Sequence, residues 1–143
     1  MKKIVITLFI IINIANYTSA KDMEKIADIE IIIADKKAEG VIYNTSAGKD
    51  FLKRLPAKFN MEDFNSTEKI SYLKEKLDTS NMPSSFDPSA SDIAYYGPWG
   101  NICIFYKDFR LSQNLYSIGR ITKGIEYFAD KNNDFEITIK VKS

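Results

Sequence analysis

The densest group of side chains that could bind a ligand is the aromatic stretch 95–101, with the sequence YYGPWGN. Aromatic rings held on strands can line a pocket, a Gly-Pro turn can shape its mouth, and an amide can both donate and accept hydrogen bonds. Tyr96, Trp99 and Asn101 are therefore candidate ligand-binding residues. The alternative is that these aromatic residues belong to the core, since alternate strand residues of a small β-barrel must fill its interior.

Acidic residues cluster in the segment 61–70 (MEDFNSTEKI). Paired carboxylates can act as acid and base or bind a hard cation. The calcium-loop pattern fails here, because Glu68 stands where glycine is needed and Lys74 where the bidentate glutamate belongs. The acidic run 130–134 fails in the same way. We expect solvated turn residues in both runs, with Glu68 as a further candidate at the rim of a pocket.

Two absences restrict the chemistry. The chain has no histidine, which excludes histidine-dependent triads and histidine-ligated zinc or haem. It has one cysteine, Cys103, so no intramolecular disulfide can form. Cys103 lies between two isoleucines in a predicted strand and is expected to be buried as a small hydrophobic residue. We expect no cofactor and no metal.

The N-terminal segment 1–20 has the layout of a secretory signal peptide. Two lysines precede the apolar run 4–15, and small residues at Thr18 and Ala20 fit the −3 and −1 positions of a cleavage site. The run is shorter than the roughly 20 residues that a spanning helix needs. The sequence predicts cleavage after Ala20, a periplasmic or secreted protein, and no stable membrane anchor afterwards. We favour the periplasm.

The remaining segment 21–143 is predicted to be one domain. With 45% hydrophobic residues in the whole chain, it can build a core without disulfides. The whole chain carries 20 basic and 19 acidic residues, and removing Lys2 and Lys3 leaves 18 against 19, a net charge of −1. A near-neutral domain offers no electrostatic reason to bind nucleic acid.

Short strands dominate the predicted elements. Alternation in 29–33 indicates a strand, which breaks at 36–40 and resumes at 41–43 as a hairpin. A short helix follows, capped by Thr45 or Ser46 and stopped by Pro56. Segment 78–91 has the composition of a loop. Further strands are expected at 57–61, 69–73, 93–96, 102–106, 115–121, 125–128 and 135–141. The pattern predicts a mainly β fold, a small closed barrel with one or two short helices.

Long strings of residues resemble the bacterial cyclophilin-like fold family. They are Leu55–Leu73 (LPAKFNMEDFNSTEKISYL), Phe86–Phe109 (FDPSASDIAYYGPWGNICIFYKDF) and Leu115–Ile121 (LYSIGRI). The resemblance implies a closed β-barrel of cyclophilin type. One position departs from the family pattern, because Ser91 stands where members usually have glycine. If that residue is left-handed, Ser91 adds some strain.

The resemblance implies no single activity, since fold alone does not determine function. True cyclophilins isomerise X-Pro bonds with an arginine and supporting residues that include histidine, and none of Arg54, Arg110 and Arg120 matches their catalytic motifs. We expect a non-catalytic module that binds a small molecule or a peptide segment. One alternative is a peptidyl-prolyl isomerase, with Arg120 as the arginine to test. Another is an accessory protein of an envelope or redox system.

Overall fold

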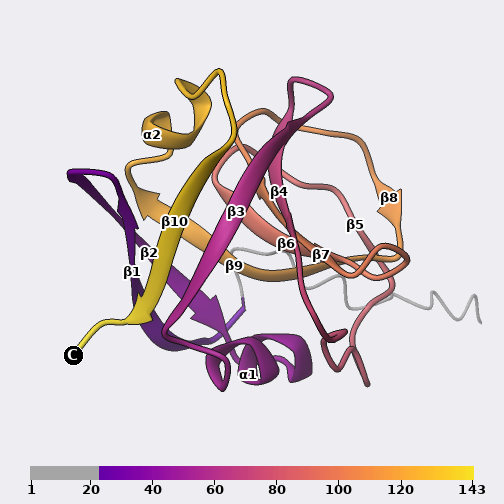
Figure 1. Ribbon diagram of the computed structural model, residues 1–143. Coiled ribbons are helices and arrows are strands. Elements are labelled where there is room, and N and C mark those ends of the chain that lie inside the picture. Colours follow the sequence, from indigo (N-terminus) through magenta and orange to yellow (C-terminus); the bar gives the residue numbers. More distant parts are fainter. Residues whose placement is uncertain (1–22) are drawn as a thin grey trace, which may run out of the picture.

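A closed antiparallel barrel forms the body of the molecule in the computed structural model, which describes residues 23–143 (Figure 1). The strands follow one another around the barrel in the order β1-β10-β3-β4-β7-β6-β9-β2. Their bounds are β1 (Lys25–Ile33), β2 (Lys36–Tyr43), β3 (Ala57–Phe64), β4 (Glu68–Tyr72), β6 (Asp92–Tyr96), β7 (Asn101–Phe105), β9 (Leu115–Lys123) and β10 (Phe135–Val141). The predicted fold class is confirmed. The predicted signal peptide lies outside the described residues.

The barrel interior is filled by side chains. Alternation along β1 places Ile29, Ile31 and Ile33 inside, where each is at most 1% exposed. Inward residues of the other strands complete this core, among them Ile42, Met61, Ile93, Tyr95, Ile102, Ile104, Ile118 and Ile137. Because the interior is packed, a ligand site must lie elsewhere on the barrel.

Two short helices cover opposite ends of the barrel (Figure 1). Helix α1 (Ser46–Leu52) begins after Thr45, whose hydroxyl accepts a hydrogen bond of 3.0 Å from the Gly48 backbone N–H. Its residue Phe51 joins the core. Helix α2 (Glu126–Ala129) covers the other end and buries Phe128 completely. No helix among residues 23–143 is long and apolar enough to cross a membrane.

Two sequence predictions need correction. Segment 125–128 was expected to be a strand, but Ile125 is the N-cap of α2 and residues 126–128 belong to that helix. Ile125 and Phe128 lie one helical turn apart, and a run of four residues is too short for periodicity to separate the two structures. The first hairpin turns at Ala34 and Asp35, and strand β2 already begins at Lys36. Ala34 takes a left-handed φ of 53° without a glycine to signal it.

The departure from the family pattern at Ser91 has the expected consequence. Ser91 has a φ of 86°, in the left-handed region that favours glycine. Its backbone N–H donates to the Phe105 carbonyl at 2.8 Å, and its carbonyl accepts from Ile121 at 2.8 Å. These two bonds to neighbouring strands hold the strained residue in place.

A second apolar cluster lies on the opposite face of β4, β7, β6 and β9. Residues that alternate with the interior set form it, namely Ile70, Ala94, Cys103, Phe105 and Leu115, together with Phe86. The short strands β5 (Ser85–Phe86) and β8 (Ser112–Gln113) pair with each other beside this face. Strand β5 lies within the segment 78–91 that was expected to be loop. In Figure 1 this pair lies on the side away from the β1–β2 hairpin.

Candidate functional site

A cavity of about 510 Å³ opens on this outer face of the barrel. That volume suits a small molecule, for which protein pockets span roughly 300–1,000 Å³. Side chains from β4, β7, β6 and β9 form its floor, and the segment 109–115 forms one wall. Glu68, Tyr96, Trp99 and Asn101, the four residues that the sequence singled out, all line it.

Asn101 supplies a buried polar group to the floor. It begins β7 and is only 1% exposed. Its Nδ2 donates to the Ile102 carbonyl at 3.4 Å and to Cys103 Sγ at 3.3 Å. Its Oδ1 is buried and has no hydrogen-bond partner among residues 23–143. A buried acceptor without a donor costs about 1–3 kcal/mol, so a donor that reaches this amide oxygen is stabilising.

Glu68 begins β4 and places a partly buried carboxyl beside Cys103. Burial raises the pKa of Glu68, the hydrogen bond with Cys103 lowers it, and the charge of Asp63 raises it. No lysine or arginine among the described residues forms an ion pair with this carboxyl. Glu68 is therefore an acid held in a desolvated position without a countercharge.

Cys103 is a poor nucleophile in this position. Burial raises the pKa of its thiol well above the ordinary value, and the neighbouring charge of Glu68 raises it further. The thiolate is the reactive form of cysteine, so a thiol that stays protonated gives little covalent chemistry. The prediction that Cys103 is buried is confirmed, although it packs under the cavity and not inside the barrel.

Aromatic rings line the cavity in two groups. Trp99 makes edge-to-face contacts with Phe64 and Tyr96, at centroid distances of 5.5 Å and 5.4 Å. Trp99 is 51% exposed and Phe64 is 40% exposed, so part of this group is open to solvent. Phe105 stacks on Phe109 at 6.5 Å in the second group. Such rings offer flat faces to an apolar or cationic ligand.

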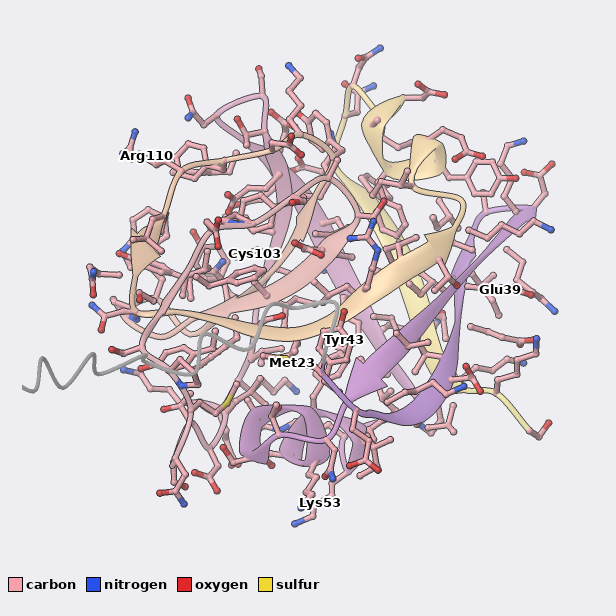
Figure 2. The ribbon with its side chains drawn as sticks, turned by 180° about the vertical axis from the view of Figure 1, so that it is seen from behind. Met23, Glu39, Tyr43, Lys53, Cys103 and Arg110 are labelled. Atoms are coloured by element: carbon pink, nitrogen blue, oxygen red, sulfur yellow. The ribbon has the colours of Figure 1, made fainter. Side chains whose placement is uncertain are left out.

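The segment 109–114 covers one side of the cavity. It is held by backbone hydrogen bonds from Phe109 to Pro88 at 2.9 Å and from Asn114 to Ser84 at 2.6 Å. Arg110 lies on this segment, with its guanidinium 4.8 Å from the centre of the Phe109 ring. Figure 2 shows Arg110 at the edge of the molecule and Cys103 farther in.

The aromatic stretch 95–101 contributes both to the core and to the cavity, which are the two roles that the sequence left open. Tyr95 points into the barrel and is 1% exposed, whereas Tyr96, Trp99 and Asn101 line the cavity. Sequence reasoning missed Phe64, Phe105 and the segment 109–115. Strand alternation could have placed Phe105 on the face of Asn101, because the two are four residues apart on one strand. No local pattern points to the segment 109–115.

Arg120 does not line the cavity. It extends from β9 and pairs with Asp92, with Nη1 2.9 Å from Oδ1. Asp92 is 2% exposed and also accepts a bond of 2.7 Å from the Ser89 backbone N–H. Burial raises the pKa of Asp92 although both partners lower it. Arg120 therefore compensates a buried carboxylate.

Lys69 follows Glu68 on β4 and lies on the opposite face. Its side chain is 3% exposed, and its Nζ contacts Asp63 Oδ1 at 3.0 Å and the Lys131 carbonyl at 2.7 Å. Asp63 also accepts a bond of 2.6 Å from the Tyr106 hydroxyl. Burial raises the pKa of Asp63, but the bonds from Tyr106 and Lys69 outweigh it and the pKa is lowered. The buried lysine is fully paired.

Two larger surface hollows flank α1, one of about 650 Å³ beside Ser46 and one of about 730 Å³ beside Arg54. Neither is lined by a buried side-chain atom that lacks a partner. Besides Asn101 Oδ1, the buried side-chain atom without a partner among the described residues is Ser117 Oγ, and Ser117 lines neither the cavity nor these two hollows. Within residues 23–143, no group of His, Cys, Asp or Glu is placed to hold a metal ion. The cavity on the outer face is thus the strongest candidate site.

Comparison with known proteins agrees with this fold. The chain is similar to the solution structure of a hypothetical protein from Archaeoglobus fulgidus, with a TM-score of 0.60 and 16% identity over 86% of this chain and 99% of that one. No curated protein matches the chain. The model of the Cyclophilin-like family matches residues 31–140, which include every barrel strand from β2 to β9, the end of β1 and most of β10. On that match the chain belongs to the Cyclophilin-like family.

Proposed function

We propose that the protein is an exported, non-catalytic module that binds a small molecule in the cavity on the outer face of the barrel. The observation that carries this proposal is the unpartnered Asn101 Oδ1 on the floor of an aromatic cavity of about 510 Å³. Native structures rarely leave such an acceptor without a donor. A bound molecule with a suitable donor would supply the missing bond.

The chemistry of the cavity supports binding over catalysis. Its one thiol, Cys103, has a raised pKa, and Arg120 is engaged with Asp92 outside the cavity. The volume favours a small molecule over a folded partner, since protein interfaces are broad surfaces of about 800 Å² per partner. The apolar rim and polar floor together would orient such a ligand.

The binding proposal can be tested with the tryptophan that the site contains. The chain has one tryptophan, Trp99, so its fluorescence reports on this cavity alone. Titrating the purified protein with a panel of small metabolites should quench or shift Trp99 emission for at least one compound. The same compound should raise the melting temperature, because ligands that bind only the folded state stabilise it.

A matched pair of variants identifies the site. Trp99→Ala should abolish the thermal shift caused by that compound. Tyr72→Ala should leave it unchanged, because Tyr72 is similarly exposed, at 57% against 51% for Trp99, but lies outside the cavity. A broad panel that produces neither a fluorescence change nor a thermal shift would contradict the proposal.

Export rests on the segment 1–20 and is tested separately. Lys2 and Lys3, the apolar run and Ala20 have the pattern of a cleavable signal peptide. We expect the protein recovered from the periplasm or medium of a bacterial host to begin at Lys21, as determined by N-terminal sequencing. A full-length chain retained inside the cell would contradict export without affecting the binding proposal.

A further inference from the structure

We propose that the cavity recognises a small organic cation, an amine or amidine on an apolar body, through Asn101 Oδ1 and the Glu68 carboxylate. This inference rests on the proposed function and specifies the chemical class of its ligand. Three features of the cavity support it.

The first feature is the hydrogen-bonding character of the floor. Asn101 Oδ1 is buried and can only accept. Its amide nitrogen is already directed to the Ile102 carbonyl and Cys103 Sγ. The Glu68 carboxylate is also an acceptor, and its neighbour Cys103 supplies a weak thiol donor. The strong polar groups of the floor are therefore acceptors, and a ligand that brings N–H or O–H groups fits them best.

The second feature is charge. Glu68 lines the cavity without an ion-pairing partner, whereas Lys69 on the other face of the strand is paired with Asp63 at 3.0 Å. Removing a carboxylate from water without a countercharge is unfavourable. Burial accordingly raises the pKa of Glu68. A ligand cation would compensate this charge and form a charge-assisted hydrogen bond with it.

The third feature is the aromatic lining. Phe64 and Tyr96 each contact Trp99 on one side, and Phe105 stacks on Phe109 elsewhere in the lining. The faces of such rings attract cations and also accept apolar groups. A ligand with a cationic head and an apolar body can therefore satisfy the floor and the walls together.

Arg110 would instead favour a ligand of negative charge. It lines the cavity and could attract an anion. However, Arg110 is exposed, with its guanidinium over the Phe109 ring, whereas Asn101 is 1% exposed. Interactions with exposed charges are weakened by water and salt, so the buried acceptors should determine the preferred charge.

The test compares probes of nearly equal shape and different charge. Phenethylamine, 2-phenylethanol and phenylacetate are titrated into the purified protein, with Trp99 emission as the readout and melting temperature as a second measure. We expect the amine to bind at least tenfold more tightly than the alcohol and the carboxylate. Glu68→Gln should weaken amine binding at least tenfold and leave alcohol binding unchanged, and Asn101→Leu should weaken both.

Controls separate the site from general effects. Glu126→Gln makes the same chemical change at an exposed position at the start of α2 and should leave amine binding unchanged. Circular dichroism establishes whether each variant is folded. If Asn101→Leu does not fold, the comparison of Glu68→Gln with the unmodified protein still tests the inference.

Equal or tighter binding of the carboxylate, or an amine affinity that survives Glu68→Gln, would overturn the cation inference and leave the binding proposal standing. Absence of binding by all three probes overturns the inference, while the metabolite panel still decides the broader proposal.

Discussion

Glu68 and Lys69 are neighbours in the sequence, yet they belong to two different electrostatic environments. Lys69 is 3% exposed and touches a carboxylate, a backbone carbonyl and two aromatic rings. Glu68 lies on the other face of β4, partly buried beside the Cys103 thiol, and lines the cavity. The protein compensates one buried charge internally and leaves the other open to a cavity. This contrast separates a residue that stabilises the fold from one that is available for a ligand.

Replacing the paired lysine should have the largest effect on stability. Lys69→Met keeps the length of the side chain but removes the bonds to Asp63 and Lys131. Breaking a buried ion pair costs about 3–5 kcal/mol, and the partial exposure of Asp63 reduces our expectation to about 2–3 kcal/mol. Urea unfolding followed by circular dichroism measures this change.

The control for that variant is Lys37→Met, which removes an exposed pair with Glu30 and should cost less than about 1 kcal/mol. If Lys69→Met is as mild as this control, the internal compensation that we assign to Lys69 is wrong.

The Asp92–Arg120 pair is an intermediate case, with a buried acid and a half-exposed base. Arg120→Met leaves Asp92 with only the Ser89 backbone N–H and should destabilise the fold by about 1–2 kcal/mol in urea unfolding. Adding Asp92→Asn should recover part of this loss, because the unpaired charge is then removed. Failure of the double variant to recover stability would argue against a compensating role of Arg120.

The carboxyl group of Asp63, which is the partner of Lys69, and that of Glu68 should change the stability of the fold in opposite directions as the pH falls. The pKa of Asp63 is lowered from 3.8, so its contribution to stability is present above that pH and is lost as pH falls through the folded value. The pKa of Glu68 is raised from 4.5, so its burial cost is absent below that pH and appears as pH rises through the folded value.

These signs can be checked by urea unfolding between about pH 3 and about pH 7. Asp63→Asn should reduce the loss of stability in acid. Glu68→Gln should increase that loss, because protonation of Glu68 in acid no longer offsets part of it. Curves that change in the same direction for both variants would contradict the contrast.

The smallest effect on stability is expected at the cavity itself. Glu68→Gln removes a desolvated charge that has no countercharge, so the free energy of unfolding near neutral pH should stay within about 0.5 kcal/mol or rise slightly. The variant thus combines intact stability with the loss of amine binding expected above. A loss of more than about 1 kcal/mol in urea unfolding would show that Glu68 is structural after all.

Much of the barrel was predictable from local patterns. Ile29, Ile31 and Ile33 alternate as a half-buried strand must, and Thr45 caps the helix as expected. Each predicted strand segment other than 125–128 falls on a strand, although Leu73 and Tyr106 lie just past the ends of β4 and β7. The errors arose where the signal was short or missing. Segment 125–128 is one helical turn, and the turn at Ala34 takes a positive φ without glycine.

The candidate site was predictable only in part. Composition and turn residues drew attention to Tyr96, Trp99 and Asn101, and their common cavity follows from the pairing of β6 with β7. The contribution of Arg110 and its neighbours was not predictable, because segment 109–114 is held by long-range bonds to Ser84 and Pro88. No periodic pattern records such contacts.

By itself, the sequence determined the absence of histidine chemistry and disulfides, the strand periodicity and the barrel class, because each of these depends on composition or on neighbouring residues. Only the tertiary structure decided which face of each strand is inside. It gave Lys69 its partners, and it brought Glu68 and Asn101 into the lining of one cavity, with Asn101 Oδ1 buried and unpartnered. The reason is geometric, since successive strand residues point to opposite faces and the partners that compensate a charge come from distant segments.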